Sequence, residues 1–107
     1  MTTIRFFRSR GRLTGFTCTG HSGYAEEGED IVCAAISSAV TLTECILNDA
    51  QNVGATYTVD ENSTRISLSL DPDAPQYAAA KPVLTGFYLV MREYENEYPE
   101  HLTVLEV

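Results

Sequence analysis

The sequence has few basic residues, an odd number of cysteines and no long uninterrupted apolar run. Its 107 residues include 7 basic and 15 acidic side chains and only 3 cysteines. Phosphate neutralisation needs clustered Lys and Arg, so a net charge of −8 argues against nucleic-acid binding. Three cysteines without paired spacing argue against a disulfide framework and are read as free thiols. A membrane span needs roughly 18–20 apolar residues, so we expect no membrane segment.

What is present fits one cytoplasmic domain over residues 1–107. The chain is 44% hydrophobic, enough for a real core, and it contains no repeat, linker or low-complexity stretch. Residues 1–6 begin like a strand and contain no apolar signal-peptide stretch, so we expect a cytoplasmic protein. The first 20 residues carry four arginines and no acid, whereas the remainder is strongly acidic. Such acidity suits a basic protein partner, although solubility alone explains it more simply.

Hydrophobic periodicity predicts the element order β-β-α-β-β-α-β. Alternating apolar residues predict strands over 2–8, 12–20, 53–59, 66–70 and 102–105, with the first four forming two hairpins. Helical spacing predicts helices over 30–49, with Asp30 as N-cap, and over 82–98, with Pro82 in the first turn. Whether residues 74–81 form a separate short helix stays open. The expected fold class is α+β (α/β type), two helices packed on a mixed, mostly antiparallel five-stranded sheet.

His21 and Cys33 are the residues best placed for chemistry. His21 leaves the end of a predicted strand, and Cys33 falls in the first turn of the first predicted helix, at the edge of its apolar face. A helix N-terminus favours the reactive thiolate, and a nearby imidazole supplies a base. From spacing alone, a packing role for Cys33 is more common than catalysis, so both interpretations stay open.

The same residues do not suit a metal site. Cys18, His21, Cys33 and Cys45 nominally make four ligands. Cys45, however, follows Cys33 by twelve residues, about 18 Å along a helix. Cys18 and His21 project from opposite faces of a strand, so zinc ligation is not expected. Cys18 and Cys45 are read as structural thiols, and His101 as a surface histidine.

Two neighbouring strings resemble the signature of the ribosomal-processing cysteine protease family, Prp. They are Gly20-His21-Ser22-Gly23-Tyr24-Ala25 and Gly28-Glu29-Asp30-Ile31-Val32-Cys33-Ala34-Ala35-Ile36-Ser37. The predicted helix, the second hairpin and the ending Glu97-Tyr98-Pro99 extend the resemblance over essentially the whole chain. It implies a small cytoplasmic homodimer without cofactor or metal. Such enzymes remove the short N-terminal extension of the bacterial large-subunit ribosomal protein numbered twenty-seven.

The resemblance also implies roles for individual residues. Cys33 matches the nucleophile and His21 the general base and acid, while Asp30 either orients His21 or caps the helix. Ser37, one turn beyond Cys33, matches a serine that supports the site. Ser22 stands where many members carry alanine. The remaining expectations are that Gly20, Ser22, Gly28 and Ser37 contact substrate.

The glycine-rich segment 20–29 is expected to act as a mobile lid over the substrate. Backbone N–H groups at the helix start, that of Cys33 included, are expected to stabilise the oxyanion. Two other functions remain open. One is a non-catalytic ribosome-assembly factor that binds a basic ribosomal protein, and the other is a thiol-based redox protein. Loss of function on replacing Cys33 separates a protease from a binding module.

Overall fold

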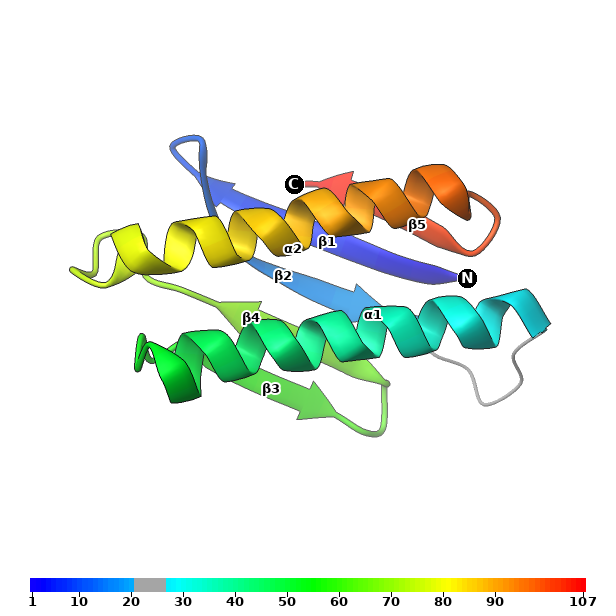
Figure 1. The fold of residues 1–107 in the computed structure, drawn as a ribbon, viewed down its shortest axis with the longest axis horizontal. Coiled ribbons are helices and arrows are strands. Elements are labelled where there is room, and N and C mark those ends of the chain that lie inside the picture. Colours follow the sequence, from blue (N-terminus) through cyan, green and yellow to red (C-terminus); the bar gives the residue numbers. More distant parts are fainter. Residues whose placement is uncertain (21–26) are drawn as a thin grey trace.

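The computed structural model describes residues 1–20 and 27–107, with the backbone alone for 27–30. The strands are β1 (Thr2–Ser9), β2 (Arg12–Thr19), β3 (Thr56–Asp60), β4 (Arg65–Ser69) and β5 (Leu102–Glu106). The helices are α1 (Glu27–Cys45), continued by the π-helical segment η1 (Ile46–Ala50), and α2 (Tyr77–Glu97). This confirms the predicted order β-β-α-β-β-α-β (Figure 1).

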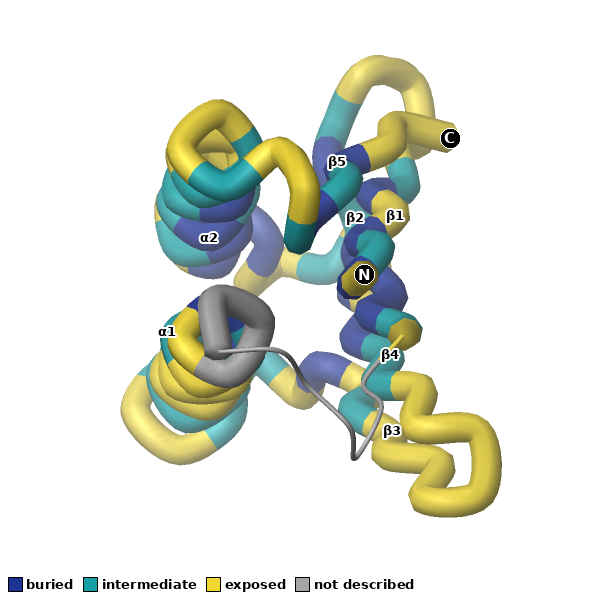
Figure 2. The backbone as a smooth tube through the Cα atoms, turned by 90° about the vertical axis from the view of Figure 1, so that its right-hand side faces the viewer, coloured by how far each residue is buried: buried dark blue, intermediate teal, exposed yellow. Residues whose placement is uncertain are grey.

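The strands form one sheet in the order β3-β4-β2-β1-β5. The β1–β5 pair is parallel and the other three pairs are antiparallel, as in the predicted mixed, mostly antiparallel sheet. Both helices lie on the same face of the sheet, so the molecule has two layers (Figures 1 and 2). One end of the sheet holds the beginnings of β1 and β5 and the end of β2, because Thr2 pairs with Leu102 and Thr3 with Thr19.

The core lies between the sheet and the helices, and strand alternation explains its composition. Ile4 and Phe6 of β1 and Phe16 of β2 are fully buried, as period-two alternation predicts. Phe16 stacks on Phe87 of α2 with 4.3 Å between ring centroids, which ties the second helix to the centre of the sheet. The first helix contributes its predicted apolar stripe, including the buried side chains Val32, Ile36 and Val40.

The second helix begins earlier than predicted. It starts at Tyr77, so Pro82 lies inside the helix rather than in its first turn, and residues 77–81 are part of α2. The buried Tyr77 hydroxyl donates a 2.6 Å hydrogen bond to the Leu13 carbonyl, and Ala80 is fully buried. These contacts hold the additional turn against the sheet. Pro82 and Ala78 are both exposed, so water can satisfy the carbonyl of residue 78, which Pro82 cannot bond.

The first helix also begins earlier, at Glu27. Residues 27–29 therefore belong to α1 and not to the predicted loop, and Asp30 lies within the helix rather than at its N-cap. Cys33 consequently lies in the second turn of α1 instead of the first. The predicted capping role of Asp30 is thereby corrected, whereas its role toward His21 stays a prediction.

The hydropathy of α1 is a further feature of this helix. An 18-residue window within Ile31–Ala50 has a mean hydropathy of 1.7, so length and composition alone would allow this helix to cross a membrane. The stretch is not an uninterrupted apolar run, because polar residues such as Ser37, Thr41 and Glu44 interrupt it. In the fold, the stretch packs along the sheet and supplies Val32, Ile36, Val40 and Leu47 to the core. A core helix meets the same criterion when its outer face also carries small and apolar residues.

Candidate active site

Cys33 is half-buried and faces the beginning of β1. Its Sγ lies 3.7 Å from the Oγ1 of Thr2, a distance at which either atom can donate a hydrogen bond to the other. Thr2 itself is fully buried. The helical position of Cys33 at the edge of the apolar face, predicted from the sequence, is confirmed by its intermediate burial. A cysteine at such a position is open to reaction on one side and held by the protein on the other.

The backbone around Thr2 is fixed by both neighbouring strands. The Thr2 N–H donates a 3.0 Å hydrogen bond to the His101 carbonyl, just before β5. Gly20 follows β2 with a φ of +99°, and a Cβ placed there would collide with the Met1 carbonyl. Glycine is therefore required at this position both by its backbone angle and by close approach to β1. The residue that precedes His21 in the sequence thus lies against the strand that contacts Cys33.

The other predicted site residues are described only in part. His21 and Ser22 lie outside the described residues, as does most of the predicted lid. Gly28 and Asp30 are placed in α1 by their backbone alone. The structure therefore brings Gly20, Thr2 and Cys33 to one place and leaves the predicted partnership of His21 with Cys33 untested.

The helix start at Glu27 changes the expected electrostatics of the nucleophile. The free N–H groups of an α-helix belong to its first turn, and the effect of the helix dipole falls off within that turn. Cys33 lies beyond it, so its own N–H belongs to the hydrogen-bond ladder of α1 and is not a free oxyanion donor. Among the described residues, Thr2, which the sequence analysis did not single out, lies within hydrogen-bond distance of the sulfur. Thr2 shares the core-facing side of the strand with Ile4 and Phe6, and this alternation is the sequence signal that could have identified it.

Ser37 lies one turn beyond Cys33 and is exposed. It lines a pocket of about 350 Å³ between α1 and the turn that connects β3 to β4. The other lining residues are Val59, Asp60, Glu61, Thr64 and Ile66. The pocket combines apolar side chains with two carboxylates, a surface that suits an extended peptide with apolar and basic residues.

The two remaining cysteines are poor nucleophiles. Cys18 is fully buried on β2, and burial, with a smaller contribution from Cys33, raises its pKa to about 11. The pKa of the half-buried Cys45 is also raised, first by desolvation and then by the carboxylates of Asp49 and Glu44. Both environments disfavour the thiolate, which is the reactive form.

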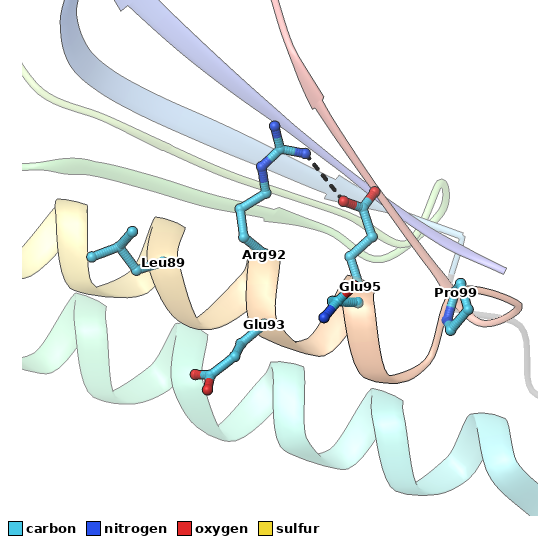
Figure 3. Close-up of a pocket in the computed structure, with 6 residues that line it drawn as sticks. Leu89, Arg92, Glu93, Glu95 and Pro99 are labelled. Atoms are coloured by element: carbon cyan, nitrogen blue, oxygen red, sulfur yellow. Dashed lines mark hydrogen bonds and ion pairs between the residues drawn. The ribbon is translucent and has the colours of Figure 1, made fainter.

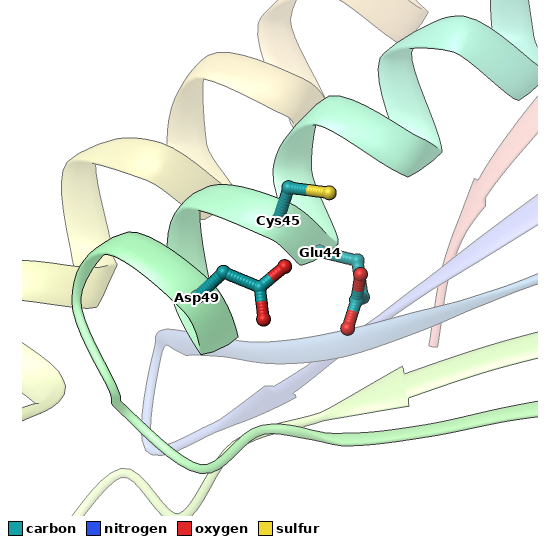
Figure 4. A group of neighbouring side chains, drawn as sticks. All are labelled: Glu44, Cys45 and Asp49. Atoms are coloured by element: carbon teal, nitrogen blue, oxygen red, sulfur yellow. The ribbon is translucent and has the colours of Figure 1, made fainter.

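Glu44, Cys45 and Asp49 form a cluster that the sequence analysis missed (Figure 4). Their possible ligand atoms lie within 4.8 Å of one another. Asp49 lies in η1, which directly continues α1, and it follows Cys45 by four residues, a spacing that places both side chains on one helix face. All three groups can bind cations, but the carboxylates are partly solvated and such clusters commonly stay empty.

A shallow pocket of about 710 Å³ on α2 has a structural role. Leu89, Glu93, Asn96 and Pro99 line it together with Arg92 and Glu95, which form a 3.1 Å ion pair (Figure 3). Arg92 also pairs with Glu106 of β5 at 3.4 Å. These ion pairs join α2 to the edge of the sheet.

Comparison with known proteins agrees with the resemblance seen in the sequence. A family model described as cysteine protease Prp matches residues 1–103. The ribosomal processing cysteine protease Prp of Bacillus subtilis is 30% identical over 95% of this chain and 92% of its own length. The protein of the same name from Mycoplasma genitalium is 31% identical over 81% of this chain and 82% of its own length.

Solved structures have the same fold. A Streptococcus mutans protein superposes with a TM-score of 0.89 at 24% identity, covering 100% of this chain and 94% of its own. The Staphylococcus aureus ribosomal processing protease Prp, in complex with a substrate peptide, superposes with a TM-score of 0.89 at 18% identity, and each chain is covered completely. The fold and the sequence matches together define a cysteine protease. The chain belongs to the cysteine protease Prp family.

Proposed function

We propose that this enzyme removes the short N-terminal extension of the bacterial large-subunit ribosomal protein numbered twenty-seven, with Cys33 as nucleophile and His21 as general base and acid. The observation that carries the proposal is the family match over residues 1–103, which includes the string from His21 to Cys33. The position of Gly20 against β1, which in turn contacts Cys33, supports it. A basic ribosomal protein also complements the net charge of −8.

The proposed reaction has two steps. His21 takes the proton of the Cys33 thiol, and the thiolate attacks the carbonyl carbon of the scissile peptide bond. The resulting tetrahedral intermediate collapses to a thioester on Cys33, and the leaving amine takes the proton from His21. A water molecule, deprotonated by His21, then hydrolyses the thioester, and the thiol regains its proton. The reaction needs no metal or cofactor.

The Ser37 pocket is the proposed place for substrate beside the nucleophile. It lies one helical turn from Cys33, and its carboxylates Asp60 and Glu61 favour a basic segment. Gly20, Ser22 and Gly28 remain the other proposed substrate contacts. Orientation of His21 by Asp30 is likewise a proposal that rests on the sequence, as is a lid formed by the part of the segment 20–29 that precedes α1.

We further propose that the enzyme acts in the cytoplasm as a homodimer. The outer surface between α1 and α2 holds an apolar pocket of about 250 Å³. Leu42 lines it and is 62% exposed, and Leu89 of α2 is 58% exposed. An apolar pocket with exposed leucines on the same two helices is the kind of surface that commonly marks a protein interface.

The test is cleavage of the purified ribosomal protein with its N-terminal extension, followed by mass spectrometry. Wild-type enzyme is expected to release the N-terminal segment, and Cys33→Ala and His21→Ala are expected to release none. Cys45→Ala serves as the matched control, since it removes a thiol from the same helix and should leave cleavage unchanged. Full-rate cleavage by Cys33→Ala contradicts the proposal. Binding of the extended protein without cleavage by the wild type favours an assembly factor.

A further inference from the structure

The contact between Thr2 and Cys33 carries an inference of its own, which rests on the proposed function. We propose that Thr2 is a positioning residue, whose hydroxyl holds the Cys33 sulfur in place and stabilises its thiolate. The two residues come from opposite layers of the fold, β1 and α1, and lie 31 positions apart in the sequence. Their contact therefore depends on tertiary structure and not on local helix geometry.

Burial explains why the hydroxyl needs this partner. Thr2 is 0% exposed, and a buried hydroxyl without a hydrogen bond is destabilising. Within the part of the chain that the structure describes, the hydrogen-bond partner of this hydroxyl is the Cys33 sulfur at 3.7 Å. A valine would fill the same space on the core face beside Ile4 without that cost. The Cys33 sulfur therefore explains why a polar side chain occupies this buried position.

The hydroxyl can serve both protonation states of the sulfur. A neutral thiol donates weakly to Oγ1, whereas a thiolate accepts from the rotated O–H. The second bond is stronger because its acceptor is charged, so the hydroxyl favours the reactive form. Cys18 of β2 is electrostatically coupled to Cys33, and with a pKa of about 11 it remains a neutral thiol while Cys33 reacts.

The position of Thr2 is rigid enough for this role. Its N–H is bonded to the His101 carbonyl, and its Cα lies beside the site where a Gly20 side chain would stand. Threonine is also β-branched, so its χ1 angle is restricted and the hydroxyl has few alternative directions. Preorganised contacts of this kind hold a reacting atom in place without a cost in entropy during the reaction.

The experiment measures alkylation of Cys33 by iodoacetamide as a function of pH, with the modified site located by peptide mass mapping. Thr2→Val removes the hydroxyl and keeps the shape. It should move the midpoint of the alkylation profile up by about one pH unit and lower the rate at neutral pH about tenfold. Thr2→Ser keeps the hydroxyl but not the β-branch, so its profile should lie much closer to that of the wild type than the Thr2→Val profile does. Thr43→Val is the control. It removes a different buried hydroxyl, which lies on α1 and donates to the Ala39 carbonyl, and it should leave the profile unchanged.

An unchanged midpoint in folded Thr2→Val overturns the proposal, as does an equal shift in Thr43→Val. If Thr2→Val folds poorly, a double-mutant cycle decides the question through melting temperatures. Thr2→Val should be more favourable in a Cys33→Ala background than with Cys33 present, because the hydroxyl has then lost its partner. Equal effects in both backgrounds contradict the contact. The alkylation assay tests the role of Thr2 without any peptide cleavage, so a failure of this proposal can be distinguished from a failure of the proposed function.

Discussion

Replacing Gly20 by alanine should destabilise the protein far more than the same change at Gly11. Both glycines have a positive φ, +99° at Gly20 and +79° at Gly11, so alanine is strained at each by about 1 kcal/mol. The surroundings differ. A Cβ at Gly11 meets nothing within 4 Å, whereas a Cβ at Gly20 collides with the Met1 carbonyl, and a backbone atom cannot swing aside as a side chain can.

Overpacking of this kind costs about 1–3 kcal/mol, so Gly20→Ala should lose about 2–4 kcal/mol and Gly11→Ala about 1 kcal/mol. For a domain of this size each kcal/mol lowers the melting temperature by roughly 4–8 °C, so calorimetry resolves the difference. Gly20→Ala should also slow alkylation of Cys33, because a displaced Met1 carries Thr2 with it. Equal melting temperatures for the two variants would refute the claim that Gly20 is required by close approach to β1.

Three further variants test other parts of the structure. Tyr77→Phe should cost about 1–3 kcal/mol in chemical denaturation, because the Leu13 carbonyl loses its buried donor; an unchanged midpoint would contradict this. Arg8 donates to Glu106 and lowers the pKa of that carboxyl, so wild type should be more stable than Glu106→Gln at neutral pH. That difference should vanish as the pH falls through the lowered pKa, and a constant difference in melting temperature across pH would contradict the pairing. Leu42→Glu should convert the proposed dimer to a monomer in light scattering, and a monomeric wild type would refute the dimer.

The strands and the sheet could be predicted because alternation determines which residues reach the core. Ile4 and Phe6 alternate with exposed or half-exposed neighbours, and a hairpin then fixes the pairing of β1 with β2. The apolar stripe of α1 could be predicted from the sequence in the same way. These patterns are local and follow from strand and helix periods alone.

The helix starts could not be predicted, because tertiary contacts decide them. Pro82 suggested a first turn, yet the bond from Tyr77 to Leu13 stabilises five additional residues of α2. The start of α1 lies in a Gly- and Glu-rich stretch that has little helical pattern. This start moved Cys33 out of the first turn, so the electrostatic argument drawn from the sequence does not hold for it.

The candidate site could be predicted only in part from the sequence. The resemblance identified Cys33 and His21, but nothing local connects residue 2 with residue 33. The packing of α1 against the beginning of β1 creates that contact. The cluster at Cys45 is different, because Glu44, Cys45 and Asp49 are neighbours in the sequence and their helical spacing could have indicated it.

The central claim is that Cys33 is the nucleophile of a peptidase. The most direct measurement is intact-mass spectrometry of enzyme quenched in acid during turnover of the extended ribosomal protein, with the modified residue mapped by digestion. The account predicts a thioester that carries the cleaved N-terminal segment on Cys33, absent from Cys33→Ala and from unreacted enzyme. Cleavage that proceeds at full rate in Cys33→Ala, or an acyl group found on Cys18 or Cys45 instead, would contradict it.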